Sequence, residues 1–165
     1  MTAVQEVEPP MLLDEAATRI GQACRAHARV FELLGRASTM AGPAPLLVSL
    51  HLSSRAHGAA AEAFADRLPV SASLPLERYD VEPAAAIAAA LDALDGALAS
   101  GVADAVAEVY LRTVLPALSS AHGAHRARTR PWCDAPVVAV LEAVERQLAA
   151  DRAHFAQLLG TGASS

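Results

Sequence analysis

Three ionisable residues fall on otherwise apolar helical faces in this chain: His27, His57 and Asp151. Placed at 100° per residue, the stretch 46–68 forms one apolar stripe with His57 near its middle. A charge buried without a partner is costly, so such groups pair with one another, bind metal or become neutral. The sequence therefore predicts that these three side chains meet inside the protein.

Two kinds of chemistry fit this set. Two histidines and one carboxylate suit a single ferrous ion with open positions for oxygen and substrate, so His27, His57, Asp151 and the nearby His154 are the candidate ligands of one iron or manganese ion. Without a metal, Asp151 can orient His57 as a general base beside Tyr110, in an apolar cavity that holds an organic substrate. His27, His57 and Tyr110 also have a plain explanation as satisfied core side chains, and His154 has one as a solvated side chain on the flank of its helix.

Four helical stretches position these residues. They are bounded by glycine and proline signals, and we expect them over residues 12–37, 46–68, 83–128 and 135–159. Residues 69–83 contain three prolines and predict a long crossover. The expected fold is an all-α, antiparallel four-helix bundle, as one domain over 12–160 with a flexible lead-in at 1–11 and a disordered tail at 161–165.

The helical periods predict which faces point inward. In the first helix the inward face is expected to include Cys24, His27 and Phe31. The third helix should break or kink at Ser100-Gly101 and kink again at Pro116. One of its stripes contains Val102, Val106, Val109, Tyr110, Thr113, Ala117, Ser120 and Ala124, and the opposite side carries Leu111, Leu115 and Leu118. Because both sides are apolar, this helix is expected to be central or to contact a partner chain, as in a homodimer.

The run Ser54-Arg55-Ala56-His57 and the run Asp151-Arg152-Ala153-His154 both place a polar residue three positions before a histidine. In this spacing the chain resembles the ferritin-like superfamily, in particular small bacterial relatives of non-haem di-iron tRNA-hydroxylase-type proteins. The resemblance implies paired Glu-x-x-His motifs on a four-helix bundle. Ser54 replaces one bridging carboxylate, and His27 and Tyr110 stand where glutamates are expected, so the implied di-iron site is degenerate here.

Composition limits the classes of partner. The chain has 165 residues, a net charge of −5 and a pI near 5.6, which argues against a nucleic-acid binder. It has no apolar stretch long enough for a membrane helix and no signal peptide, so we expect a cytoplasmic protein in which Cys24 is a buried free thiol. The stretch His122 to Trp132 is rich in histidine and arginine, which suits a helix C-terminus or an anion or protein contact.

Two functions of different classes follow from these observations. The first is a small-molecule tailoring enzyme with oxidative or acid/base chemistry at His27, His57 and Asp151. The second is a non-catalytic accessory or ligand-binding protein that has lost the metal site. A transcription regulator's effector domain is disfavoured, because no helix-turn-helix precedes the bundle. The partner expected in the first two cases is a small organic molecule.

Overall fold

The computed structural model describes residues 11–69 and 79–162, and the side chains within them except those of residues 131–133 and 161–162. This part of the chain is almost entirely helical, which confirms the all-α prediction. Its elements are α1 (Leu13–Ala37), α2 (Ala44–Ala65), α3 (Ala85–Leu98), α4 (Ala103–Val109), the π-helical turn η2 (Tyr110–Val114), α5 (Leu115–Arg128) and α6 (Pro131–Gly162). Residues 1–10 of the predicted lead-in, most of the crossover and the end of the tail lie outside the described residues.

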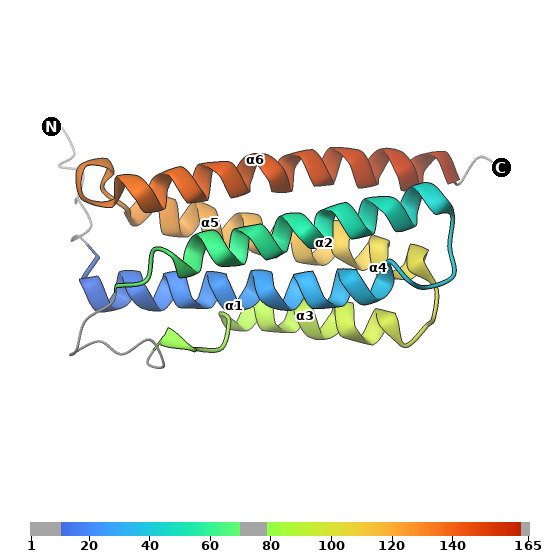
Figure 1. The fold of residues 1–165 in the computed structure, drawn as a ribbon, viewed down its shortest axis with the longest axis horizontal. Helices are drawn as coiled ribbons and strands as arrows, with labels where there is room; N and C mark the ends of the chain where they lie inside the picture. The colour runs from blue at the N-terminus through green and yellow to red at the C-terminus, as the bar shows by residue number, and fades with distance from the viewer. Residues whose placement is uncertain (1–10, 70–78, 163–165) are drawn as a thin grey trace, which may run out of the picture.

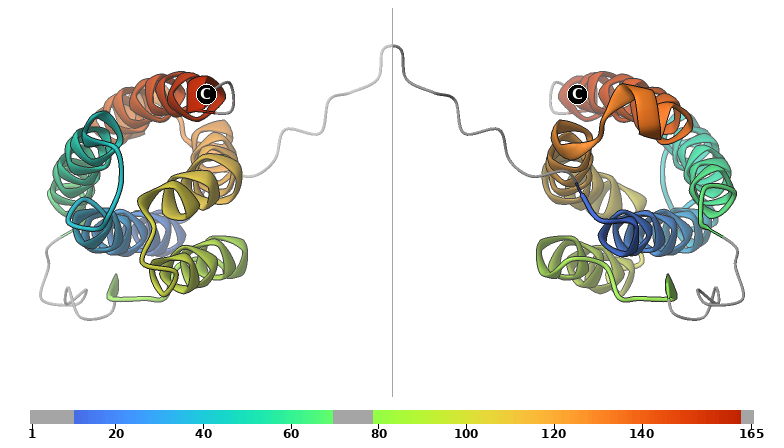
Figure 2. Two further views of the ribbon diagram at one scale, coloured as in Figure 1. Left: turned by 90° about the vertical axis from the view of Figure 1, so that its right-hand side faces the viewer. Right: turned by 90° about the vertical axis from the view of Figure 1, so that its left-hand side faces the viewer.

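The long helices run side by side, and successive ones point in opposite directions (Figure 1). Seen from the end, α1, α2, α6 and the continuous α4–η2–α5 helix surround a common interior (Figure 2). Helix α3 lies outside this ring and packs on α1, α4 and η2. The interior enclosed by the ring is therefore where inward polar side chains can meet.

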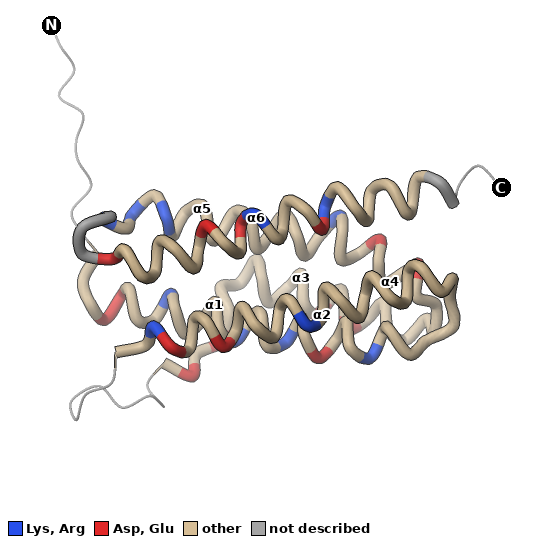
Figure 3. The backbone as a smooth tube through the Cα atoms, turned by 45° about the horizontal axis from the view of Figure 1, so that its top comes forward, with Lys and Arg blue, Asp and Glu red and all other residues tan. Residues whose placement is uncertain are grey.

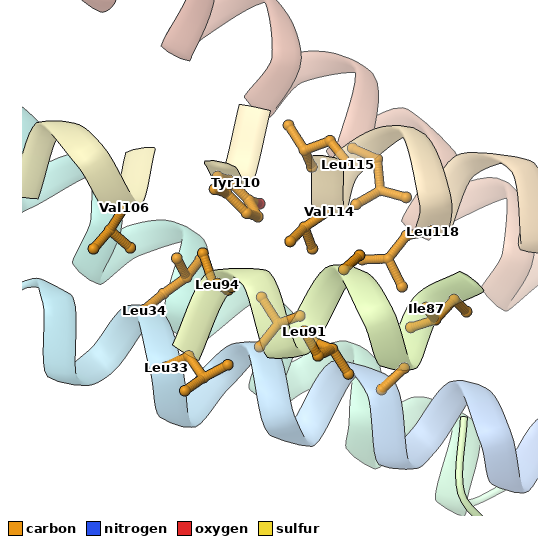
Figure 4. Packing of buried hydrophobic residues seen from close by; sticks show 14 of the residues in the cluster. Leu33, Leu34, Ile87, Leu91, Leu94, Val106, Tyr110, Val114, Leu115 and Leu118 are labelled. Carbon is orange, nitrogen blue, oxygen red and sulfur yellow. The ribbon is translucent and has the colours of Figure 1, made fainter. Parts of the chain in front are cut away.

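The predicted break at Ser100-Gly101 is a complete reversal of the chain, so the segment 83–128 is not one kinked helix. After α3 the chain reverses through Gly101, which has a φ of 71°, and returns as α4. The backbone N–H of Ala103 then donates to the carbonyl of Ala41, which ties the reversal to the α1–α2 connection. One apolar side of the α4–α5 helix is thus covered by α3 of the same chain. Leu91 and Leu94 of α3 lie between α1 and the α4–α5 helix (Figure 4). The homodimer through this segment stays a prediction.

The π-helical turn η2 changes which residues of the α4–α5 helix face inward. Pro116 has no N–H to donate and its ring clashes with the carbonyl of Arg112, so a regular helix cannot continue there. The extra residue in the wider turn moves the inward face by one position. Val106 and Tyr110 are buried as predicted, but Val102, Thr113, Ser120 and Ala124 are exposed, so that part of the predicted stripe is wrong. Val114, Leu115, Leu118, His122 and His125 are buried instead.

Two predicted inward residues of α1 also differ. Phe31 is 45% exposed and lies against Gly58 of α2, so its predicted place on the inward face is wrong. Cys24 is a free thiol, but it is only partly buried. Burial and the nearby Asp80 carboxylate raise the pKa of this thiol. Helices α1 and α2 approach closely here because small residues meet at the contact, as where Gly35 faces the Ser54 hydroxyl.

Gly21 is required where the crossover returns to α1. A Cβ atom at this position would lie 2.2 Å from the backbone carbonyl oxygen of Tyr79. We expect Gly21→Ala to lower the free energy of unfolding by about 2 kcal/mol, because either backbone must move to relieve the clash. Urea unfolding followed by circular dichroism measures this change.

Gly96→Ala is the matched control, since nothing lies within 4 Å of a Cβ built at Gly96 in α3. It should raise the free energy of unfolding by about 0.5–1 kcal/mol through helix propensity and reduced chain entropy. A Gly21→Ala protein as stable as the Gly96→Ala protein would contradict the close contact with Tyr79.

Charged residues of both signs are interspersed along the same helices (Figure 3). Several form ion pairs at the surface, such as Arg29 with Glu32 and Asp95. Within the described residues, none of the helices combines the length and apolar character needed to cross a membrane. The interior of the described structure is formed by the apolar core and by the buried polar groups described below.

Candidate functional site

Three buried histidines from three helices form a connected row in the interior. The Nδ1 atom of His27 on α1 lies 2.7 Å from Nδ1 of His57 on α2. On the other side of the same ring, Nε2 of His27 lies 2.9 Å from Nε2 of His122 on α5. All three rings are at most 2% exposed. His27 thus shares both of its ring nitrogens with other histidines.

The row continues from His57 toward α6. Nε2 of His57 lies 2.8 Å from the hydroxyl of Tyr110, which donates a 2.6 Å hydrogen bond to Oδ2 of Asp151. The other carboxylate oxygen of Asp151 accepts a 2.8 Å hydrogen bond from the amide of Gln147. We refer to the five buried residues of this row, His122, His27, His57, Tyr110 and Asp151, as the buried polar chain, and Gln147 at its end is exposed.

Local sequence explains how these side chains come together. Tyr110 is the first residue of the π-helical turn. This turn shifts the inward face of the following helix α5 by one residue, and His122 therefore points into the interior. The rings of His27 and His122 stack on each other with centroids 5.1 Å apart, and both stack on Phe64 of α2. Phe155 contacts Tyr110 edge-on from α6. Aromatic packing therefore fixes the ring planes that the hydrogen bonds require.

Burial keeps the histidines of the chain uncharged. Desolvation lowers the pKa of His57 to about 3 and the pKa of His122 to about 4, with smaller contributions from neighbouring histidines. Burial and the adjacent His57 and His122 also hold the pKa of His27 well below its usual value. For Tyr110, burial and the Asp151 carboxylate raise the pKa well above 10. At neutral pH all three imidazoles and the phenol are therefore neutral.

The direction of every proton in the chain follows from its Asp151 end. The Tyr110 hydroxyl uses its single hydrogen on the carboxylate, so its oxygen must accept from Nε2–H of His57. A neutral His57 then has no hydrogen on Nδ1, so His27 donates from Nδ1. A neutral His27 accepts at Nε2, and His122 donates from Nε2. The geometry thus fixes the tautomers of all three histidines, with each donor pointing toward Asp151.

Such a directed chain can move a proton over its full length. A proton added to Nδ1 of His122 allows each bridging proton to shift one bond toward Asp151. The carboxylate ends protonated, and the three imidazoles end neutral in the opposite tautomer. No imidazole has to stay charged in the apolar interior, which is the state that burial disfavours.

The buried polar chain forms part of the floor of a cavity between α2 and α6. This cavity has a volume of about 530 Å³ and is contacted by His27, His57 and Gln147. Its walls are small and apolar, with Arg67 near the end of α2: Ala56, Ala59, Ala60, Ala63, Pro136, Ala139, Val140, Ala143, Val144 and Leu148. We call it the α2–α6 pocket. Its size and composition match those of sites for small organic molecules.

The structure brings together most of the predicted site residues. His27 and His57 are in direct contact, and Asp151 reaches His57 through Tyr110. His154 lies apart: it is exposed, and its Nε2 hydrogen-bonds with the hydroxyl of Ser49.

The donor atoms do not converge as a three-ligand metal site would require. His27 faces His57 and His122 with opposite sides of its ring, and Tyr110 separates Asp151 from His57. Within the described part of the chain, no group of three or more His, Cys, Asp or Glu side chains could hold a metal ion. The described residues therefore do not fit such a site, and the iron or manganese ion stays a prediction.

Sequence reasoning missed His122, Gln147 and His125. His122 and His125 lie seven and ten residues after Leu115, so they continue the leucine side of the helix. This spacing was a usable signal, but the surrounding arginines favoured an exposed helix end. Only the π-helical turn, which the sequence pattern does not show, makes that side the inward one.

His125 is a buried histidine outside the polar chain. It is 3% exposed, and within the described structure its Nε2 has no hydrogen-bond partner. We expect His125→Leu to raise the free energy of unfolding by about 1 kcal/mol, because it removes an unsatisfied polar atom from the core. His122→Leu is the control and should destabilise the protein, since it leaves Nε2 of His27 unpaired. Equal losses in urea unfolding for the two variants would contradict this difference.

Comparison of the chain with protein-family models, curated proteins and solved structures finds no match. The ferritin-like resemblance accordingly stays a prediction. The α2–α6 pocket and the buried polar chain are the features of the described structure that bear on its function.

Proposed function

We propose that this protein binds a small, largely apolar organic molecule in the α2–α6 pocket. The scaffold for this site is a ferritin-like, antiparallel four-helix bundle, to which α3 adds an outer helix. One observation carries the proposal: the apolar α2–α6 pocket rests on the buried polar chain, whose protons are already ordered. A ligand that contacts this floor meets neutral rings and apolar walls, so it loses little by leaving water if it is itself apolar.

A substitution that reduces the volume of the pocket tests this proposal. Ala60 lies on the α2 wall, and a leucine there would fill part of the space. The neutral fluorophore N-phenyl-1-naphthylamine should bind to the wild-type protein, and Ala60→Leu should weaken that binding at least tenfold. The control is Ala86→Leu on the exposed face of α3. The proposal fails if the fluorophore does not bind, or if the two variants bind it equally.

Metal-free acid/base catalysis is the second candidate, and the directed run from His57 to Asp151 favours it. Both ring nitrogens of His57 are occupied, so His57 can act as a base on a ligand only if its bond to His27 opens. A bound ligand that inserts there would free the Nδ1 lone pair of His57, while Tyr110 and Asp151 keep the ring oriented. Nitrogen-15 NMR of the histidine rings, with and without ligand, detects this opening. Unchanged His27 and His57 signals in the saturated complex would exclude this role with that ligand.

A further inference from the structure

The α2–α6 pocket is long as well as apolar. Its lining residues run from Ala56 along α2 to Arg67, just past the end of that helix, and from Pro136 to Leu148 along α6. At 1.5 Å of rise per residue, each run corresponds to roughly 17 Å along the bundle. The walls consist mainly of alanine and valine, so the pocket matches an extended, narrow molecule better than a bulky one.

Charge is present at only one end of this pocket. Arg67 follows the last turn of α2, and among the described residues it is the one charged side chain that lines the pocket. It is exposed, and within the same part of the chain it has no ion-pair partner. Arg29, by contrast, is paired with Glu32 and Asp95. The guanidinium of Arg67 is thus available to a ligand.

The other end of the pocket would repel an anion. There His57 and His27 are neutral, and the carboxylate of Asp151 lies just beyond Gln147 and Tyr110. A negative group would have to lose its water beside this carboxylate without a compensating positive charge. An anionic head is therefore favoured only at Arg67, and the apolar part of the ligand points toward His57.

From this polarity we propose that the ligand of the α2–α6 pocket is a monocarboxylate with an extended apolar body, whose carboxylate pairs with Arg67. The inference rests on the proposed ligand site and adds its chemical class. A guanidinium and a carboxylate form paired, charge-assisted hydrogen bonds. An amine would face Arg67 as a like charge. The acidic residues of this region, Asp66 and Asp134, line a neighbouring cavity that Arg67 also contacts, and neither of them lines the α2–α6 pocket.

Three ten-carbon probes test the inference by isothermal titration calorimetry at low salt: decanoate, decanol and decylamine. Decanoate should bind about fivefold more tightly than decanol, in keeping with the modest strength of exposed ion pairs, and the difference should shrink at high salt. Arg67→Gln should abolish the difference. Arg67→Glu should reverse it, so that decylamine binds more tightly than decanoate. Arg55→Gln is the matched control, an exposed arginine of α2 that does not line the pocket.

The outcomes separate this inference from the proposed function. If decanoate and decanol bind equally, and both are lost in Ala60→Leu but unaffected by Arg67→Gln, the pocket stands and the carboxylate assignment is overturned. If none of the three probes binds, both fail. A decanoate preference that Arg55→Gln removes as strongly as Arg67→Gln would also overturn the assignment to Arg67.

Discussion

Tyr110→Phe should lower the free energy of unfolding by about 3 kcal/mol, although it removes only one oxygen atom. That oxygen accepts from His57 and donates to Asp151, and all three groups are buried. Its removal leaves an unpaired N–H and a carboxylate with one fewer donor, and each loss costs about 1–3 kcal/mol in a buried site. Urea unfolding at pH 7 measures the change.

The control for this variant is Tyr79→Phe. Tyr79 is also a buried tyrosine, but its hydroxyl reaches Asp14 only at 3.5 Å, so the expected loss is below about 1 kcal/mol. The two variants should also differ at high pH. The raised pKa of Tyr110 keeps the folded state protonated where the unfolded phenol ionises, so stability falls as the pH rises above about 10, and Tyr110→Phe removes this loss. Equal effects of the two variants would contradict the bridging role of Tyr110.

The free energy of unfolding should fall steeply as the pH drops from 7 toward 4. The pKa values of His27, His57 and His122 are lowered in the folded state, so below about pH 6.5 the unfolded chain binds more protons. Burying these neutral histidines does not reduce the free energy of unfolding above this pH, and reduces it progressively as the pH falls below it. For His122, whose pKa is about 4, the loss is on the order of 3 kcal/mol by pH 4.

His122→Gln tests this dependence at one position. Glutamine keeps an N–H donor for His27 but cannot take up a proton, so the slope of unfolding free energy against pH should decrease by about one proton near pH 5. Urea unfolding at half-unit intervals from pH 4.5 to pH 7 gives the slopes. His51→Gln, at an exposed position of α2, is the matched control. If both variants show the same slope, His122 is not the neutral buried group that the structure describes.

The sequence predicted the helical content and part of the interior. Burial of His27, His57 and Tyr110 follows from their places on apolar stripes, because a regular helix repeats every 3.6 residues. Asp151 was found in the same way on α6. His27, His57 and Asp151 lie in regular α-helix, and Tyr110 is the first residue of the π-helical turn, so a regular period can be extrapolated as far as each of them.

The other features of the fold and the site depend on local irregularities of the backbone, which a regular helical period of apolar residues does not predict. The chain reversal at Gly101 separates α3 from α4, whereas a glycine in a helical pattern is equally compatible with a kink. The π-helical turn at Tyr110 shifts the inward face by one residue and so brings His122 into the site. The contacts among the histidines depend on the direction in which each side chain points as well as on the helix face that carries it. Sequence spacing predicts only the face, so it could not predict which histidines pair.

The most direct test is the tautomeric state of the three histidines, measured at pH 7 by long-range proton–nitrogen NMR. The structure predicts Nε2–H for His57, Nδ1–H for His27 and Nε2–H for His122, with all three rings neutral. Spectra of His57→Gln, His27→Gln and His122→Gln assign the signals. An imidazolium at any of the three positions, or a His27 protonated at Nε2, would contradict a neutral chain directed toward Asp151.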